Sequence, residues 1–479
     1  MDVVNMAVRY KIFGKQEYAY RIWNEKNPKT GKWIQRSEYL GAVVDKENGV
    51  YEKRNEKKLA ERKSEQKEQS ILDYGDCYFF IEFMKKDTIL PIMQGIFKKH
   101  TDTLLCLLLY KLHGGSAMRH VELWYDGNVA KILLPNAAVS TQRISEFLNI
   151  IGKEKLQMSF FKNYLASICG DKSGLIIDST GLPSQVNMPI TSWGHHDGGI
   201  EKETRLILVV EKETKMPLYF RYVAGNIQDV STLITTICEI KKLGVVPTLC
   251  IIDAGYYSEA NIKALYSGEV SFLTRMPSNR VIYKSLIHED DASIERSENA
   301  VKYGKRGLFI RKRHIDLYGY PAFAYVVCDP IRRGKEISKK ILGLESMEDE
   351  LDLEGSGMMV LVSNVDMNID EVVPFYYSRQ MAEQLFGISK DDLNILPIRT
   401  HSEARFRGLM LLSFIALIVY IKVKTFLGAE ITVEQVLLLM RNLKCKVFSD
   451  KSLIVSEVNK QQRLIFENAK FLVPKNSGI

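Results

Sequence analysis

Four polar side chains between residues 376 and 390 are spaced so that they can act together: Tyr376, Arg379, Glu383 and Lys390. In a helix these positions fall within roughly 60° of one another, because successive residues advance by about 100°. The opposite face of the predicted helix is apolar and can pack on a core. An ordinary amphipathic helix, with Arg379 and Glu383 as an i,i+4 ion pair, is the simpler interpretation.

Two upstream aspartates favour a chemical role for this helix. Asp178 and Asp253 each follow an apolar, β-type run, at residues 175–177 and 248–252. An aspartate at the end of one strand often caps the next helix, but two parallel strands would bring both carboxylates to one edge of a sheet.

Three carboxylates, Asp178, Asp253 and Glu383, repel one another unless cations lie between them. Hard oxygen ligands of this kind suit Mg²⁺ or Mn²⁺. Two such ions about 3.5 to 4 Å apart can activate a water or a 3′-hydroxyl and stabilise a leaving oxygen. The three residues therefore predict two-metal phosphodiester chemistry.

Composition sets the wider limits. The chain has 479 residues and a net charge of 66 − 58 = +8, so we expect two or three domains and a protein that suits a polyanion partner, although many soluble proteins are as basic. Its seven cysteines are scattered, which favours reduced thiols in the cytosol. No export signal is evident, and the longest apolar run, residues 409–421, is shorter than the roughly 20 residues that span a bilayer. We expect a buried core helix there and no membrane partner.

The elements that must position these residues change in character along the chain. Helical periodicity precedes residue 170, strands and helices alternate after it, and helices return near the C-terminus. The predicted regions are a small β-rich module at 1–51, a charged helix or linker at 52–77, a helical DNA-binding region at 78–169, an α/β core at 170–278 and 365–425, a β-rich insertion at 279–364, and a helical C-terminal region at 426–479.

Several local signals refine this picture. Ser140 can cap a helix in which Gln142 and Arg143 suit DNA contacts, although a capped surface helix is the simpler interpretation. Ser258 is a predicted cap, and Thr432 with Gln435 is a predicted capping box. Cations interleaved with aromatic residues between 302 and 313 suit a nucleic-acid backbone.

The spacing of the first four residues resembles a family signature. Tyr376-x2-Arg379-x3-Glu383-x6-Lys390 matches, without a gap, the Tyr-Arg-Glu-Lys signature of the DDE transposases of bacterial insertion sequences, in the large family numbered four. The resemblance covers about residues 174–420. It extends to the segments LIIDSTGL around Asp178 and IIDAGYYS around Asp253, and to Gly225-Asn226-x2-Asp229.

This resemblance implies a ribonuclease-H-like core, a mixed sheet flanked by helices, with a β-rich insertion between Asp253 and Glu383. It implies that Asp178, Asp253 and Glu383 are the catalytic metal ligands for two Mg²⁺ ions, which Mn²⁺ can replace. By the same resemblance, Tyr376, Arg379 and Lys390 hold DNA phosphates near the cut.

The implied function is cut-and-paste transposition. The enzyme would bind the terminal inverted repeats of an insertion sequence as a homodimer, cleave the DNA, and join the 3′-hydroxyl ends to target DNA. Its expected location is the cytoplasm of a bacterium, associated with the nucleoid. The alternatives are a ribonuclease-H-like DNA nuclease without strand transfer, and an inactive or domesticated DNA-binding protein.

Overall fold

The computed structural model divides the chain into two compact units. Unit 1 comprises Met1–Leu72, Lys444–Glu457 and Pro474–Ile479, and unit 2 comprises Asp73–Leu443 and Val458–Val473. The structure describes residues 3–14, 16–26, 32–53, 68–115, 117–170, 172–184, 186–196, 199–343, 352–449 and 452–474. The predicted charged helix or linker falls largely on residues 54–67, which lie outside the described ranges.

Unit 1 contains two small sheets. Strands β1 (Val3–Phe13), β2 (Gln16–Lys26), β3 (Trp33–Asp45) and β4 (Val50–Glu52) pair in the order β1-β2-β3-β4. Gly41 in β3 lets β4 approach, because a Cβ there would lie 2.6 Å from the carbonyl carbon of Glu52.

The second sheet of unit 1 joins β5 (Glu68–Asp73) to β16 (Lys444–Phe448) and β17 (Leu453–Val455), in the order β17-β16-β5. We expected only helices after residue 425, and these two strands correct that expectation. Cys445 and Val447 alternate with exposed or half-exposed neighbours, a period of two that is typical of a strand.

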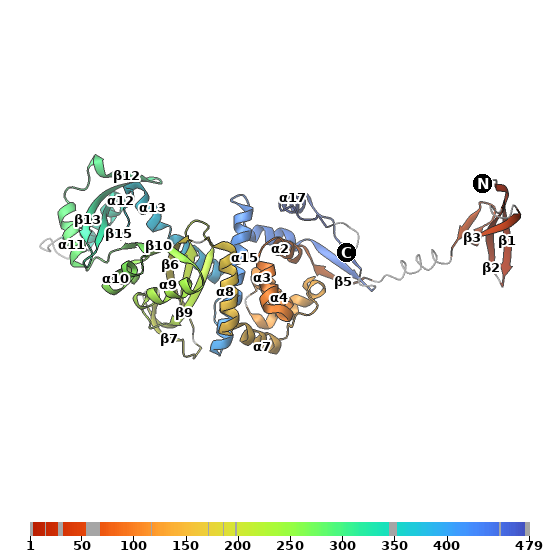
Figure 1. Ribbon diagram of the computed structural model, residues 1–479, viewed down its shortest axis with the longest axis horizontal. Coiled ribbons are helices and arrows are strands. Elements are labelled where there is room, and N and C mark those ends of the chain that lie inside the picture. Colours follow the sequence, from red (N-terminus) through yellow and green to blue (C-terminus); the bar gives the residue numbers. More distant parts are fainter. Residues whose placement is uncertain are drawn as a thin grey trace. The chain divides into compact units, whose positions relative to one another are not determined.

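Unit 2 begins with a group of helices around one long apolar helix, α15 (Glu403–Leu427) (Figure 1). Helix α15 packs against α4 and α7. It is longer than the apolar run at 409–421 and is long and apolar enough to cross a membrane, but 72% of its apolar window is buried inside the protein. The surrounding helices are α2 (Gly75–Lys85), α3 (Ile89–Phe97), α4 (Thr101–Leu112), α5 (Val121–Asp126), α6 (Ala130–Leu133), α7 (Thr141–Ile151) and α8 (Glu154–Ile168).

The sheet of unit 2 has ten strands in the order β12-β13-β14-β15-β11-β10-β6-β8-β7, with β9 paired to β8. Its centre is parallel, because β10 runs parallel to both β6 and β11. The strands are β6 (Lys172–Pro183), β7 (Ser192–His196), β8 (Gly199–Glu211), β9 (Pro217–Ala224), β10 (Val246–Ile252), β11 (Ser271–Arg275), β12 (Ala300–Tyr303), β13 (Arg306–Asp316), β14 (Pro321–Cys328) and β15 (Met358–Ser363).

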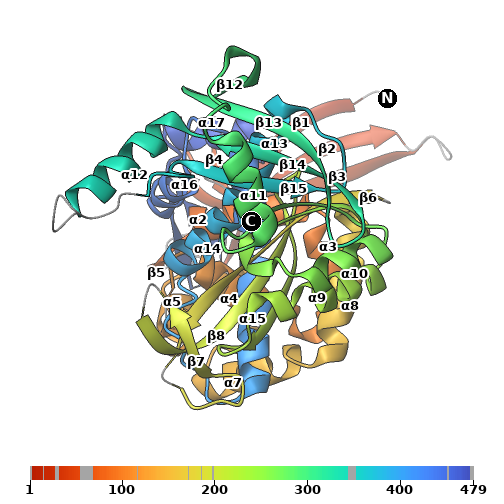
Figure 2. The same ribbon diagram turned by 90° about the vertical axis from the view of Figure 1, so that its left-hand side faces the viewer.

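Helices connect and cover these strands. Helices α9 (Leu233–Lys242) and α10 (Glu259–Ser267) lie side by side, and α12 (Pro330–Leu342) projects from the sheet with none of its residues buried (Figure 2). Further helical elements are α11 (Val281–Asp290), α13 (Ile369–Tyr377), α14 (Gln380–Gly387), the π-helical turn η6 (Ile388–Asp392), α16 (Val433–Arg441) and α17 (Lys460–Asn468).

Two of the predicted helix caps are present in the structure, and a third is not. The Ser258 side chain accepts a hydrogen bond from the backbone N–H of Asn261, and Thr432 with Gln435 forms the predicted capping box. Ser140 precedes α7 in an extended conformation, but its side chain makes no capping hydrogen bond. The predicted Ser140 cap is therefore wrong, and the first N–H groups of α7 lack that acceptor.

Candidate active site

The register of two parallel strands brings Asp178 and Asp253 to one edge of the sheet. Ile177 in β6 lies opposite Ile252 in β10, so the aspartate after each isoleucine emerges at the same level. Contrary to our expectation, β6 does not end at Asp178. It continues to Pro183 because the strand stays paired with β8 after β10 has ended.

The helix with the polar stripe is divided into three helical segments. Tyr376 lies in α13, Arg379 precedes α14 as its N-cap, and Glu383 lies in α14. Lys390 lies in the π-helical turn η6. The α-helical pattern is lost after Ser378, because the backbone N–H groups of residues 379 and 381 donate to the carbonyls three residues earlier, at 3.3 and 3.0 Å. The prediction of one unbroken helix from 376 to 390 was therefore wrong, although the polar side chains still lie close together.

Arg379 lies at the point where the three carboxylates meet. Its Nη1 is 3.1 Å from Oδ2 of Asp178 and 3.0 Å from Oε1 of Glu383. Its Nε is 3.7 Å from Oδ1 of Asp253. Three acids from β6, from the end of β10 and from α14 are thus held by one guanidinium group.

The other two residues of the stripe contact the same edge of the sheet. The Tyr376 hydroxyl donates to Oδ1 of Asp253 at 3.0 Å, and Nζ of Lys390 donates to Oγ1 of Thr180 at 2.9 Å. Burial, together with the charge of Asp253, raises the pKa of Tyr376, so this hydroxyl stays a proton donor. All six predicted residues therefore lie in one neighbourhood.

Asp178 is the most deeply placed of the three acids, and it is 8% exposed. Burial raises the pKa of its carboxyl to about 6, Arg379 opposes the rise, and Asp253 and Glu383 add to it. Glu383 is more open, with 53% of its side chain exposed. The site thus has a buried side at Asp178 and an open side at Glu383, where a substrate can reach it.

The donor set fits divalent metal ions. Three carboxylates concentrate negative charge and hard oxygen ligands around a single positive group, and carboxylate oxygens are the ligands that Mg²⁺ and Mn²⁺ prefer. The Nε of Arg379 is buried and makes no hydrogen bond in the described part of the chain. The single positive charge of the guanidinium therefore offsets only part of the negative charge of the three carboxylates.

A supporting layer of polar residues lies behind Asp178, and few features of the sequence indicated it. Ser179 donates to Oδ1 of Asp229 at 2.6 Å, and Nη1 of Arg205 lies 3.1 Å from both oxygens of Asp229. Thr180 belongs to the same strand and holds Lys390. The signal that could have indicated Asp229 is its place in the Gly225-Asn226-x2-Asp229 segment.

The basic stretch between 302 and 313 is less free than its sequence indicates. Arg311 lies 2.7 Å from the buried Asp290, which also pairs with Arg313, and Lys312 pairs with Asp366. These cations stabilise β13 against neighbouring segments because each finds an acid that is distant in sequence. Lys302 and Lys305 of the same stretch are exposed, and its contact with a nucleic-acid backbone stays a prediction.

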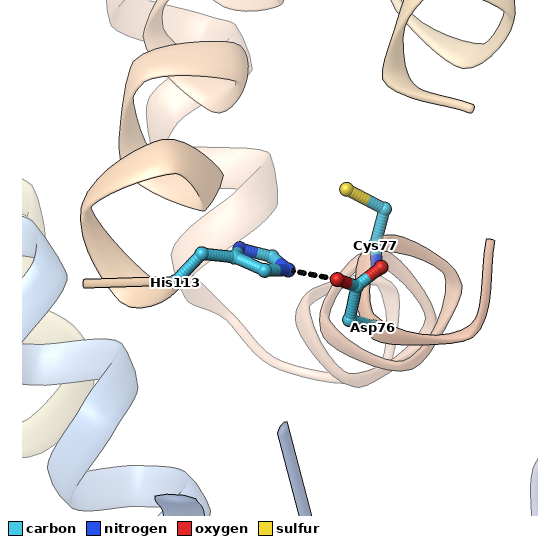
Figure 3. Close-up of side chains that lie close together, drawn as sticks. All are labelled: Asp76, Cys77 and His113. Atoms are coloured by element: carbon cyan, nitrogen blue, oxygen red, sulfur yellow. Dashed lines mark hydrogen bonds and ion pairs between the residues drawn. The ribbon is translucent and has the colours of Figure 1, made fainter. Parts of the chain in front are cut away.

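A second group of possible metal ligands lies among the helices of unit 2 (Figure 3). Asp76, Cys77 and His113 are, in the described residues, the one His, Cys, Asp and Glu group whose ligand atoms all lie within 4.8 Å of one another. Nε2 of His113 is 2.7 Å from Oδ2 of Asp76, and Nδ1 is 2.5 Å from the carbonyl oxygen of Leu109.

This group is better explained as a buried structural contact between two helices. Asp76 lies in the first turn of α2, where the helix dipole favours its negative charge, and His113 follows the end of α4. Burial raises the pKa of the Cys77 thiol, which opposes the thiolate that a metal would need. The pair fastens α2 to α4.

A comparison with known protein families bears on the region that holds the carboxylate cluster. A family model described as a transposase DDE domain matches residues 170–419, a range that includes Asp178, Asp253 and Glu383. The chain belongs to the DDE transposase family. Members of this family generally use divalent metal ions, in agreement with the donor set of this transposase.

Other comparisons add less. No curated protein matches the transposase. Among solved structures, the piggyBac transposase in a synaptic complex with hairpin DNA, determined by cryo-EM, is similar with a TM-score of 0.43 and 11% sequence identity. The similarity covers 71% of this chain and 70% of that chain.

Proposed function

We propose that this protein is a cut-and-paste transposase of the insertion-sequence family numbered four, with a ribonuclease-H-like core. It binds terminal inverted repeats, cleaves the DNA and joins the 3′-hydroxyl ends to target DNA. The observation that carries the proposal is the convergence of Asp178, Asp253 and Glu383 on Arg379. The Tyr376, Arg379, Glu383 and Lys390 spacing supports the finer family assignment.

Each residue of the site has a role in this proposal. Asp178, Asp253 and Glu383 hold two Mg²⁺ ions, or Mn²⁺ in their place. When bound, such ions activate the attacking water or 3′-hydroxyl and stabilise the leaving oxygen. Tyr376, Arg379 and Lys390 hold phosphates beside the cut. Tyr376 also orients Asp253 through its hydrogen bond.

The chain offers a further basic surface for DNA. Helix α12 has no buried residue and carries five Lys and Arg side chains, and the whole chain has a net charge of +8. The two arginines of α12 pair with acids, so its three lysines form the basic surface. Such charge is suited to the phosphate backbone of double-stranded DNA. The proposal also assigns action as a homodimer on the DNA ends, in the cytoplasm of a bacterium on its nucleoid.

The regional roles follow from the placement of the site. We assign the catalytic core to the regions that contain the three acids and their strands. The core comprises residues 170–278 and 365–425, and the insertion between its two parts comprises residues 279–364. The flanking regions are the N-terminal module (1–51), the charged segment (52–77), the helical DNA-binding region (78–169) and the C-terminal region (426–479).

A two-step DNA assay tests this function. The purified protein is incubated with Mg²⁺ or Mn²⁺ and a DNA fragment that carries the terminus of the element, and then with pre-cleaved ends and a target plasmid. The wild type should nick the terminus and join the ends, whereas Asp253→Ala should bind the DNA without either reaction.

Each other outcome has a definite meaning. Cleavage without joined products would indicate that the protein is a nuclease without strand-transfer activity. Binding of the ends without any cleavage by the wild type, together with identical behaviour of Asp253→Ala, would reduce the protein to a DNA-binding function.

A further inference from the structure

A cavity of about 270 Å³ lies among α4, α7 and the start of α15 in unit 2. Four cationic side chains line it: Lys111, Arg119, Arg399 and Arg405. Of the described residues that line it, none is acidic. We propose that this cavity binds a phosphate group.

The first argument is the buried charge of Lys111. This residue is 1% exposed, and its Nζ donates to the carbonyl oxygens of Leu393 at 2.9 Å and Asn394 at 3.4 Å. An ammonium group has three donors, and no carboxylate of the described residues pairs with this one. Burial without a counter-charge lowers the pKa of Lys111 to about 8. A bound anion would supply that charge.

The second argument comes from polar atoms that lack partners. Nε of Arg405 and Oγ1 of Thr400 are buried, and neither has a hydrogen-bond partner in the described part of the chain. Both residues line the cavity. Leaving such groups unpaired costs roughly 1 to 3 kcal/mol each, and hydrogen bonds to the oxygens of a ligand would offset that cost.

The third argument is the start of α7. Thr141 and Ser145 from its first turns line the cavity, and Ser140 leaves the first N–H groups uncapped. A helix N-terminus favours an anion through these N–H groups and the helix dipole. This feature strengthens a site that the cations already define.

The chemistry points to phosphate more than to a carboxylate. Several cations and hydroxyl groups require a ligand with more than one oxygen acceptor and concentrated negative charge, and arginine matches phosphate oxygens through two parallel hydrogen bonds. The phosphate can belong to a DNA strand or to a small free molecule. Because the cavity shares no lining residue with the carboxylate cluster, the inference goes beyond the proposed function, and either can fail alone.

Isothermal titration calorimetry on the full-length chain tests the proposal. The probes are inorganic phosphate and a ten-nucleotide single strand of DNA with a 5′-phosphate. The variant is Arg119→Gln with Arg399→Gln, because both side chains are exposed and neither forms an ion pair in the described residues. It should bind phosphate at least tenfold more weakly than the wild type.

The matched control removes the same charge elsewhere in unit 2. Lys460→Gln with Arg463→Gln changes two exposed cations of α17 that do not line the cavity. The control should bind phosphate like the wild type, and melting temperatures should show that both variants are folded.

The pattern across probes identifies the source of the phosphate. Tenfold weaker binding of both probes by the cavity variant, with phosphate displacing the oligonucleotide, would assign the site to a DNA strand. Weaker binding of inorganic phosphate alone would assign it to a free phosphate compound. Equal loss in the control variant, unchanged binding in the cavity variant, or no phosphate binding by the wild type would overturn the proposal.

Discussion

Arg379 occupies the position from which positive charge reaches all three acids. It pairs with Asp178 and Glu383 at 3.1 and 3.0 Å and approaches Asp253 at 3.7 Å. Divalent ions bound by the same carboxylates would compete with this guanidinium. In the metal-free protein, therefore, Arg379 stabilises the folded state by offsetting the repulsion of the acids.

Arg379→Gln should make the protein depend on metal for stability. Without the guanidinium, the acids lose their counter-charge, and the melting temperature in EDTA should fall. The expected loss in the free energy of unfolding is roughly 2 kcal/mol. Added Mn²⁺ should then raise the melting temperature more than in the wild type, because no guanidinium competes with the ion. Differential scanning calorimetry with and without Mn²⁺ measures both effects.

The control for this prediction is the double variant Arg379→Gln with Glu383→Gln. It lacks one of the carboxylates and should lose the additional response to Mn²⁺. If Mn²⁺ raised the melting temperatures of the wild type and Arg379→Gln equally, the guanidinium and the metal would not share these ligands.

The raised pKa of Asp178 predicts a pH dependence of stability. Its carboxyl has a pKa of about 6 in the folded protein and 3.8 as the ordinary value, so the folded state holds this proton more tightly. The contribution of Asp178 to the free energy of unfolding therefore falls as pH rises from about 4 to 6, by about 2 to 3 kcal/mol. Above pH 6 the whole loss is present.

Asp178→Asn removes this titration and should be more stable relative to the wild type at pH 7.5 than at pH 4.5. Urea unfolding of both proteins in EDTA at the two pH values measures the change in the difference. A difference that stays constant would show that the carboxyl does not titrate in this window.

At the scale of elements, the crossing of α7 and α15 fixes the helical part of unit 2. A Cβ on Gly408 of α15 would lie 2.1 Å from the carbonyl oxygen of Leu148, and a Cβ on Gly152 would lie 2.0 Å from that of Ala404. Glycine at both positions lets the two backbones approach each other. The same crossing supports the walls of the phosphate cavity.

Gly408→Ala should therefore destabilise the protein by about 2 kcal/mol, because the helices must separate to admit a methyl group. Gly334→Ala is the control, since nothing lies within 4 Å of its Cβ position in α12. Alanine there should raise the free energy of unfolding by about 0.5 to 1 kcal/mol. Thermal or urea unfolding compares the two. Equal effects would contradict the close crossing.

Elements were predictable where the signal is local. The strand before Asp178, the strand before Asp253 and the cap at Ser258 all depend on adjacent residues, and the structure contains them. The break at Ser378 and the missing cap at Ser140 depend on neighbours in space, which the sequence pattern does not carry.

At the scale of the whole molecule, the sequence indicated which acids could act together but not how they are supported. Membership in the DDE transposase family and the parallel register of β6 and β10 agree with the prediction that Asp178 and Asp253 lie at one edge of the sheet. The contact of Lys111 with Leu393 and the pairing of Arg311 with Asp290 join residues that are far apart in the chain. No short motif marks such pairs, so the cavity and the use of the basic stretch were missed. The roles of the six site residues stay predictions.

The central claim is that the carboxylates converging on Arg379 catalyse DNA cleavage. The most direct measurement compares the wild type and Glu383→Gln in a Mg²⁺-dependent cleavage assay on a DNA fragment with the terminus of the element. Glu383 is half-exposed, so the substitution should preserve the fold. The account predicts terminus cleavage by the wild type and unchanged DNA binding but no cleavage by the variant. Equal cleavage by both proteins would contradict it.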